Sequence, residues 1–194
     1  MTYDLFLACD PGKKGAWALL NQAGELLRVE PLPYLGDRID VESLDAQWYD
    51  ALTMQPGEQS VGFNLEYPMA VQGQSGGEKT FINAGILIAL ATLRGAAIHL
   101  PKPFQWKAKM GLSKDKSASV RLAVDLWPAW REKFVGPRGG LLDGMAEAAL
   151  IAEHLRRANL RIRTPEAVGV SWQDTEGRMV SSGTGRFRDG EWVE

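Results

Sequence analysis

The N-terminal part of the chain contains three short apolar segments separated by turn-forming residues, and no other feature constrains the fold as strongly. Residues 4–10 are typical of a buried strand that ends at Asp10, and the Pro-Gly pair that follows forces a turn. Residues 15–20 and 25–31 are also strand-like, and a short polar turn separates them. We therefore predict a β-hairpin pattern at the start of the fold.

Helical and strand-like segments alternate further along the chain. The spacing of apolar residues predicts helices over 41–52, 78–93, 114–126 and 141–155, and short strands over 60–66 and 96–100. Residues 101–111 predict a loop with at most one helical turn, and Ser113 is the expected cap of the helix that follows. Strands followed by alternating helices and strands indicate an α/β fold, with a mixed sheet flanked by helices.

Length and composition favour one ordered domain with a polar extension. The chain has 194 residues, of which 45% are hydrophobic, enough for one full core but too few for two ordinary enzyme domains. Beyond residue 164 the sequence is rich in Gly, Ser, Thr and charged residues. We predict a domain over 1–164 and, over 165–194, a polar tail or a small appended hairpin of Met179-Val180 and residues 187–193.

The sequence gives no sign of secretion or of a membrane anchor. Cys9 is the single cysteine, which excludes an internal disulfide and a multi-cysteine zinc site and favours a reducing compartment. We find no signal peptide and no apolar run long enough to span a bilayer. The expected location is the cytoplasm of a bacterial or phage-infected cell.

Charge is distributed unevenly along the chain. The net charge is -2, which by itself argues weakly against a nucleic-acid partner. Residues 101–140, however, contain nine basic and three acidic side chains, so this segment is strongly positive and the remainder is negative. A positive surface beside an acidic site suits a phosphodiester substrate, whereas solvated helix faces would explain the same lysines without any ligand.

Two carboxylates stand at the ends of apolar strands. Asp10 ends the first strand, and Glu66 ends the strand over 60–66. Acidic side chains in such places require a counter-ion, and oxygen ligands of this kind suit Mg²⁺. The alternative is that each acid caps a neighbouring helix or pairs with a lysine.

A second pair of carboxylates, Asp143 and Glu147, lies four residues apart on the last long helix and therefore on one helix face. The helix dipole explains an acid in the first turn, but it explains Glu147 less well. Four carboxylates can hold two Mg²⁺ ions, or Mn²⁺, for phosphodiester hydrolysis. His99 and His154 are isolated in the sequence and are expected to be structural, so no histidine-based catalytic set competes.

Several ordered motifs resemble those of the RuvC-type Holliday-junction resolvases, in particular their phage and prophage branch. The similarity runs from about residue 4 to residue 157, and no single motif is specific by itself. Its main segments are DPGKKG from Asp10, LEYP around Glu66, Trp106-Lys107, Lys114-Asp115-Lys116, AVDLWP from Ala123, and DGMAEAALIAEH from Asp143.

The resemblance implies an RNase H-like fold: a five-stranded mixed sheet with helices on both faces. Asp10, Glu66, Asp143 and Glu147 match the metal-binding acids of the family, although its last acid is often aspartate. Lys116 matches a basic position near the scissile phosphate. The further DNA-binding residues implied are Lys13, Lys14, Gln72, Gln74, Phe81, Lys107, Lys109 and Lys114. Phe81 or Tyr67 would stack on an unpaired base at the branch point, and Phe81 could instead be a core residue.

The implied function is a homodimeric endonuclease that resolves four-way DNA junctions and leaves 5′-phosphate ends. The apolar segment over 80–93 independently favours either a central core helix or a dimer contact. Three alternatives stay open. They are an RNase H-like nuclease for flaps or single strands, a non-catalytic junction-binding relative, and an actin-like ATPase or sugar kinase, whose phosphate loop also begins Asp-x-Gly.

Overall fold

The computed structural model describes residues 2–12, 14–68, 77–113 and 115–163, together with four short strands between residues 170 and 193. For Lys116 and for everything beyond residue 160, only the backbone is described. Two compact units make up the chain, Met1–Asn159 and Leu160–Glu194. No helix within the described ranges is long and apolar enough to cross a membrane.

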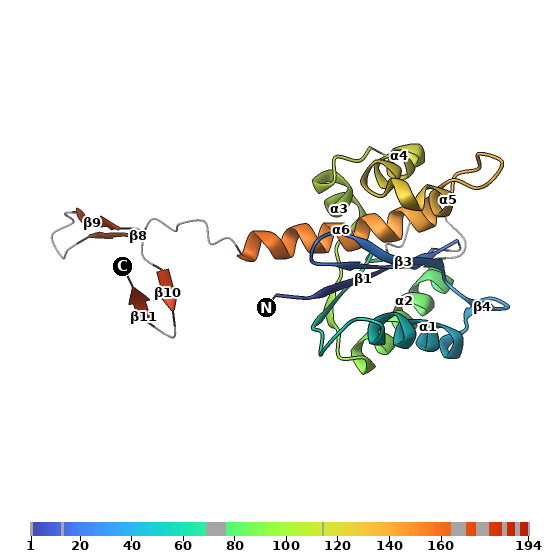
Figure 1. The fold of residues 1–194 in the computed structure, drawn as a ribbon, viewed down its shortest axis with the longest axis horizontal. Helices are drawn as coiled ribbons and strands as arrows, with labels where there is room; N and C mark the ends of the chain where they lie inside the picture. Colours follow the sequence, from blue (N-terminus) through green and yellow to red (C-terminus); the bar gives the residue numbers. More distant parts are fainter. Residues whose placement is uncertain are drawn as a thin grey trace. The chain divides into compact units, whose positions relative to one another are not determined.

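A five-stranded mixed sheet forms the centre of the first unit, in the order β3-β2-β1-β6-β7 (Figure 1). The strands are β1 (Leu5–Asp10), β2 (Ala16–Asn21), β3 (Leu26–Pro31), β6 (Val61–Leu65) and β7 (Ala97–His99). β1, β2 and β3 form an antiparallel meander, as the hairpin pattern predicted, whereas β6 runs parallel to both β1 and β7. Because β1 and β6 are parallel neighbours, Asp10 and Glu66 lie at the same end of the sheet.

Helices cover both faces of this sheet (Figure 1). One face carries α1 (Val41–Thr53) and α2 (Gly77–Leu93). The other face carries α3 (Pro103–Lys109), α4 (Lys116–Leu126), α5 (Arg131–Phe134) and α6 (Asp143–Arg163). The ladder of β4 (Tyr34–Leu35) with β5 (Arg38–Ile39) leads from β3 into α1, and the 3-10 turn η1 (Pro128–Trp130) joins α4 to α5.

Side chains of β1 alternate between two hydrophobic cores, one on each face of the sheet. Leu7 and Cys9 belong to the core under α1 and α2. Phe6 and Ala8 belong to the core under α6. Because side chains of a strand alternate with a period of two, Asp10 continues the face of Phe6 and Ala8. The strand therefore directs this carboxylate toward the α6 layer.

Small residues allow α6 to lie close to the sheet. The fully buried alanines in this core include Ala8, Ala16, Ala18, Ala146, Ala149 and Ala152. The nearest approach is at Gly144, where a Cβ atom would lie 2.0 Å from the carbonyl oxygen of Lys14. A side chain cannot be accommodated at that distance, so the first turn of α6 and the loop after β1 depend on glycine at this position.

The connection over 101–116 differs from the sequence prediction. Residues 103–109 form a full helix, α3, whose third residue, Gln105, accepts a hydrogen bond from the Lys102 backbone N–H at 3.2 Å. Asp115, and not Ser113, caps α4 by accepting from a backbone N–H in its first turn. Both cap candidates are of the favoured type, and the sequence alone does not decide between them.

The last helix also differs from its predicted bounds. α6 begins at Asp143, two residues after the expected start, because Leu141 instead forms a β-bridge with Val135. It ends at Arg163, well beyond the predicted end at residue 155.

The second unit contains two short antiparallel ladders. β8 (Val170–Gln173) pairs with β9 (Met179–Gly183), and β10 (Arg186–Arg188) pairs with β11 (Glu191–Val193). The predicted hairpin of Met179-Val180 with residues 187–193 is therefore wrong. Each strand pairs with its nearest neighbour in the chain, which closes the shorter loop. Asp189-Gly190, between β10 and β11, is a dipeptide typical of two-residue hairpin connections.

Candidate active site

Asp10 lies at the carboxyl end of β1, between the loop that follows the strand and the start of α6. Its Oδ1 accepts a hydrogen bond from the Gly12 backbone N–H at 2.9 Å. A Cβ atom on Gly144 would lie 3.6 Å from Asp10 Oδ2, so the first turn of α6 stands directly against this carboxylate. The hydroxyl of Tyr34 donates to the Gly12 carbonyl oxygen at 3.1 Å and fixes the loop from its other side.

The electrostatic environment of Asp10 shows that other carboxylates are near. The pKa of Asp10 is raised to about 7, chiefly by burial, and the Gly12 hydrogen bond partly opposes this shift. Repulsion from Glu66 and Glu147 contributes to the increase in pKa, while Lys107 lowers it. Asp10 therefore shares one electrostatic environment with two glutamates and a single lysine.

Glu66 follows β6 directly and lies on the α6 side of the sheet. Two residues earlier, Asn64 has the same strand orientation, and its side chain donates to the Ile151 carbonyl oxygen of α6 at 2.7 Å. The indole Nε1–H of Trp106, in α3, donates to Glu66 Oε2 at 2.7 Å. Burial raises the pKa of Glu66, the Trp106 hydrogen bond and Lys107 lower it, and Glu147 raises it again.

Glu147 occupies the second turn of α6 and is held by two other helices. Lys107 Nζ, from α3, donates to Glu147 Oε1 at 2.8 Å, with both side chains largely buried. Ser119 Oγ, from α4, donates to the same oxygen at 3.3 Å. The Lys107 ammonium also lies 5.2 Å from the centre of the Trp106 ring. Among the described side chains, Lys107 therefore provides the local counter-charge for a group of three carboxylates.

Asp143 is the first residue of α6 and is half-buried. It directly precedes Gly144, the residue that contacts the loop after β1, so its backbone lies at the junction between α6 and Asp10. Asp143 and Glu147 are four residues apart and therefore lie on the same face of α6, on either side of Gly144 in the sequence.

The carboxylates supply the oxygen ligands that a cation such as Mg²⁺ prefers, but they are not arranged around a single metal position in this structure. Among the described residues, no three acidic, histidine or cysteine side chains are grouped so that they could hold an ion as they stand. Lys107 binds Glu147, and Trp106 binds Glu66. Half-buried, mutually repelling oxygen donors nevertheless fit a divalent cation such as Mg²⁺, which requires few protein ligands and retains water.

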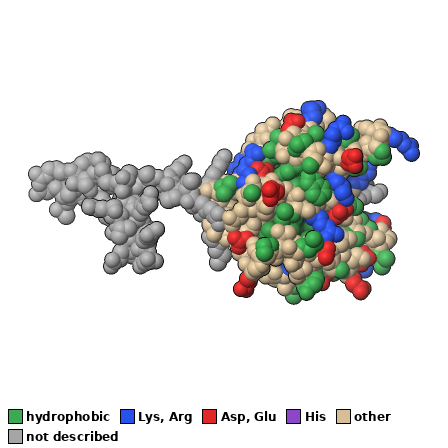
Figure 2. All heavy atoms as spheres, in the orientation of Figure 1, with side chains coloured by type: hydrophobic (Ala, Val, Ile, Leu, Met, Phe, Trp, Pro, Cys, Tyr) green, Lys and Arg blue, Asp and Glu red, His purple; other side chains and the backbone are tan. Residues whose placement is uncertain are grey.

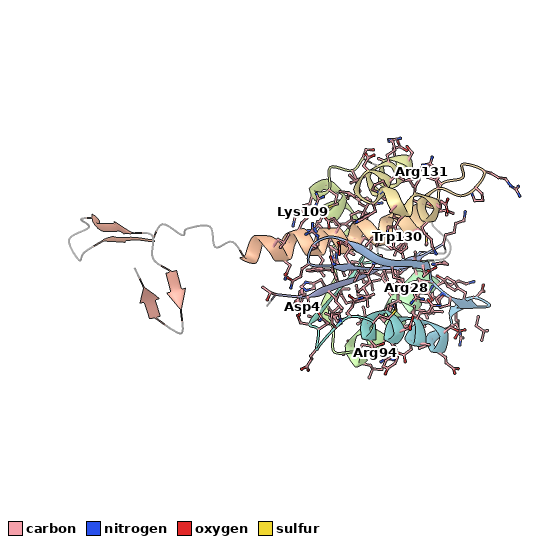
Figure 3. All side chains as sticks on the ribbon, in the orientation of Figure 1. Asp4, Arg28, Arg94, Lys109, Trp130 and Arg131 are labelled. Atoms are coloured by element: carbon pink, nitrogen blue, oxygen red, sulfur yellow. The ribbon has the colours of Figure 1, made fainter. Side chains whose placement is uncertain are left out.

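The remaining predicted DNA-binding residues are distributed around this group. Lys14 and Lys109 are exposed, and Figure 3 labels Lys109 on the α3 side of the sheet. Phe81 is 40% exposed and Tyr67 is 43% exposed, so neither is a core residue. Lys116 begins α4, but its side chain is not described. Lys13, Gln72, Gln74 and Lys114 lie outside the described residues.

Sequence reasoning missed Trp106 and Ser119 as members of the site. Trp106 appears in the sequence only as the neighbour of Lys107, and Ser119 appears only as a polar residue within a helix. One signal was available for Trp106: a fully buried tryptophan needs a partner for its indole N–H. It could not reveal which acceptor is used.

Basic side chains are frequent around α3, α4 and α5. Figure 2 shows Lys and Arg side chains over the upper part of the molecule, where these helices lie, with acidic side chains among them. This distribution agrees with the positive charge counted over residues 101–140.

Comparison with solved structures identifies the fold. The chain is similar to RuvC of Thermus thermophilus in complex with a Holliday junction substrate, with a TM-score of 0.57 and 15% identity, over 82% of this chain and 95% of that one. The chain has the RNase H-like fold of RuvC. A second Thermus thermophilus RuvC structure aligns with a TM-score of 0.55 and 17% identity, over 82% and 97% of the two chains. No protein-family profile and no curated protein matches the sequence.

The RuvC-like fold confirms the predicted architecture, including the five-stranded mixed sheet and the helices on both of its faces. At this level of identity the similarity establishes the fold alone. The chemistry of the site depends on its own side chains and not on the fold.

Proposed function

We propose that this protein is a metal-dependent endonuclease that cuts branched DNA, with four-way junctions as its preferred substrate. The observation that carries the proposal is the convergence of Asp10, Glu66 and Glu147 at one end of a RuvC-like sheet, where the two glutamates both raise the pKa of Asp10. A half-buried group of like charges is unfavourable for folding, and perturbed carboxylates of this kind are typical of functional sites.

Asp10, Glu66, Asp143 and Glu147 would hold two Mg²⁺ ions, which when bound supply an activated water and a stabilised leaving oxygen. Mn²⁺ has similar ligand preferences and would substitute. The chain's own contribution is to fix these oxygens on a strand end and on the first turns of a helix. Water attacks the phosphorus in line, the 3′ oxygen leaves, and the products carry 5′-phosphates.

Lysines on the α3–α4 side would position the phosphate backbone. Lys107 already neutralises part of the carboxylate charge through Glu147, and the exposed Lys109 follows two residues later in α3. Lys116, at the start of α4, is the residue we propose for the scissile phosphate. Lys13, Lys14 and Lys114 are proposed to contact the backbone nearby, and Gln72 and Gln74 to approach the branch point.

The aromatic residue that stacks at the branch point is proposed to be Phe81 or Tyr67. Both are substantially exposed, and they flank the segment 69–76 in the sequence. An exposed ring is able to stack on any unpaired base without reading its sequence.

A four-way junction has two-fold symmetry, so we propose a homodimer that makes paired cuts. α2 supports this because Ile82 and Leu93 are exposed on it at 50% and 85%. Apolar side chains displayed along one helix are typical of a surface that a second copy would cover.

The deciding experiment is cleavage of a synthetic four-way junction, with flap, duplex and single-strand controls, in Mg²⁺ and in EDTA. Symmetric nicks in the junction alone, and only with Mg²⁺, are the expected result. Equal cutting of flaps would shift the function to general branched-DNA processing. Tight junction binding without any cutting would leave a binding protein and refute the catalytic part of the proposal.

A further inference from the structure

Trp106 links the candidate site to α3 through a single hydrogen bond. Its side chain is fully buried, and its indole Nε1–H lies 2.7 Å from Glu66 Oε2. The two residues are held together by backbone as well, since the Tyr67 N–H donates to the Pro101 carbonyl oxygen at 2.9 Å, just before α3 begins. The side-chain hydrogen bond and the neighbouring backbone hydrogen bond therefore both fix Glu66 relative to Trp106.

The indole hydrogen bond makes the two carboxylate oxygens of Glu66 different from each other. An indole N–H is a donor only, carries no charge and cannot itself bind a cation. A hydrogen bond to a carboxylate is stronger than one between neutral groups, so it holds Oε2 in place. In the described part of the chain, Glu66 Oε1 receives no hydrogen bond. Among the described residues, Oε1 is thus the oxygen of Glu66 without a hydrogen-bond partner, and Oε2 is the one that is held.

The adjacent residue extends the same arrangement to the other glutamate. Lys107 donates to Glu147 Oε1 at 2.8 Å, so consecutive residues of α3 hold the two glutamates by one oxygen each. Lys107 carries charge and would compete with a bound cation. Trp106 is neutral and would stay in place when a cation binds.

We infer that Trp106 is a positioning residue that keeps Glu66 a one-oxygen ligand and thereby favours Mg²⁺ over Ca²⁺. The inference rests on the proposed metal dependence. Mg²⁺ takes single oxygens in tight octahedral geometry, whereas the larger Ca²⁺ accepts both oxygens of one carboxylate. Releasing Oε2 allows Glu66 to bind through both oxygens, which benefits Ca²⁺ and not Mg²⁺.

The test is calorimetric titration of Mg²⁺ and Ca²⁺ into the full-length protein without DNA. Trp106→Phe removes the N–H and retains an aromatic ring. Loss of a residue that orients a metal ligand typically weakens metal affinity ~10-fold or more, and this loss is expected for Mg²⁺. The loss for Ca²⁺ is expected to be clearly smaller, so that the Mg²⁺/Ca²⁺ affinity ratio falls.

Trp127→Phe is the matched control. Trp127 is also buried in the α6-side core, and its indole N–H donates to the Gly24 carbonyl oxygen at 2.9 Å, with no part in the carboxylate group. This variant loses a buried indole hydrogen bond of the same kind and should keep both metal affinities. A fall in the Mg²⁺/Ca²⁺ ratio as large in Trp127→Phe as in Trp106→Phe would overturn the inference.

Trp106→His is the second variant, because an imidazole N–H retains a donor. Its Mg²⁺ affinity should lie between those of wild type and Trp106→Phe, and equal losses in both variants would overturn the inference. A wild-type protein that binds Mg²⁺ but cuts no DNA would refute the proposed function and leave the Trp106 comparison valid. A wild-type protein that binds neither ion would overturn both.

Discussion

Lys107 and Glu147 form an ion pair with an Nζ–Oε1 distance of 2.8 Å, and this pair joins α3 to α6 within the candidate site. The ammonium group of Lys107 would compete with a bound metal ion, because both would interact with the carboxylate of Glu147. The ammonium of Lys107 therefore neutralises a carboxylate that the proposed metal ion would have to share or take over.

Replacing Lys107 by methionine should destabilise the metal-free protein and enlarge the effect of Mg²⁺ on stability. Both side chains are largely buried but keep some contact with solvent, so the loss of the pair should cost about 1–2 kcal/mol in the free energy of unfolding. Mg²⁺ should then stabilise Lys107→Met more than wild type, since no ammonium competes for Glu147. Urea denaturation with and without Mg²⁺ measures both quantities.

Lys133→Met is the control for that prediction, because Lys133 pairs with Glu30 at 3.0 Å on a different part of the α6-side layer. This variant should show a small loss of stability that Mg²⁺ does not change. An equal Mg²⁺ response in Lys107→Met and wild type would show that the lysine and the metal do not compete.

Asp10→Asn should stabilise the metal-free protein at neutral pH. Burial raises the pKa of Asp10 from 3.8 to about 7, so the folded state holds this proton more tightly than the unfolded state. Stability from this group is therefore lost as pH rises from about 4 through 7, by a few kcal/mol at most. Asparagine does not ionise, so its advantage should appear above pH 4 and grow up to about pH 7.5.

Thermal unfolding in EDTA over pH 4 to 8 checks this difference between Asp10→Asn and wild type. Other groups also make stability depend on pH, but they are the same in both proteins and cancel in the comparison. The raised pKa of Glu66 lowers stability as pH rises, as that of Asp10 does, whereas the lowered pKa values of Asp40 and Asp115 increase stability as pH rises. A constant offset across the pH range would show that Asp10 ionises normally in the folded protein.

Much of the fold could be predicted because its signals are local. The hairpin segments alternate over consecutive residues, and Asp10 and Glu66 end runs of buried residues, so their common location follows from two parallel strands. The bounds of α4 and α6 were less secure, since they depend on which of several capping residues is used and on the bridge between Val135 and Leu141.

The contacts within the site could not be predicted because they are not local. Glu66 and Trp106 are 40 residues apart, as are Lys107 and Glu147. α3 itself has only seven residues, and so short a segment is weak evidence for a helix even though it begins with a proline, which is common at a helix start. Lys107 was expected to meet the DNA backbone, and its partner in the protein emerges only from the packing of α3 against α6.

Gly144→Ala should disrupt the site even though alanine favours helices. A Cβ atom at this position would lie 2.0 Å from the Lys14 carbonyl oxygen, so α6 would have to move away from the loop after β1. We expect a loss of about 1–3 kcal/mol in the free energy of unfolding and a larger proportional loss of junction cleavage. Chemical denaturation and the cleavage assay measure the two effects.

Gly140→Ala serves as the control for that change. Position 140 lies shortly before α6, and a Cβ atom there meets nothing within 4 Å. The variant should remain within about 0.5 kcal/mol of wild type in stability, as do most surface substitutions. Similar losses of stability and cleavage in both variants would show that the site does not depend on the close approach of α6 to Asp10.

Asp10→Asn should also separate junction cutting from junction binding. The carboxylate is the central member of the group, since both Glu66 and Glu147 act on its pKa, so its loss should reduce cleavage in Mg²⁺ to background. Binding in EDTA should be retained or tightened, because one negative charge that faces the phosphates is gone. Gel-shift and cleavage assays on the same four-way junction measure both, with Asp50→Asn, which removes a carboxylate paired with Arg28 elsewhere on the surface, as the control. Normal cleavage by Asp10→Asn would refute the assignment of the catalytic site, whereas loss of binding together with cleavage would assign Asp10 a structural role in forming the DNA surface.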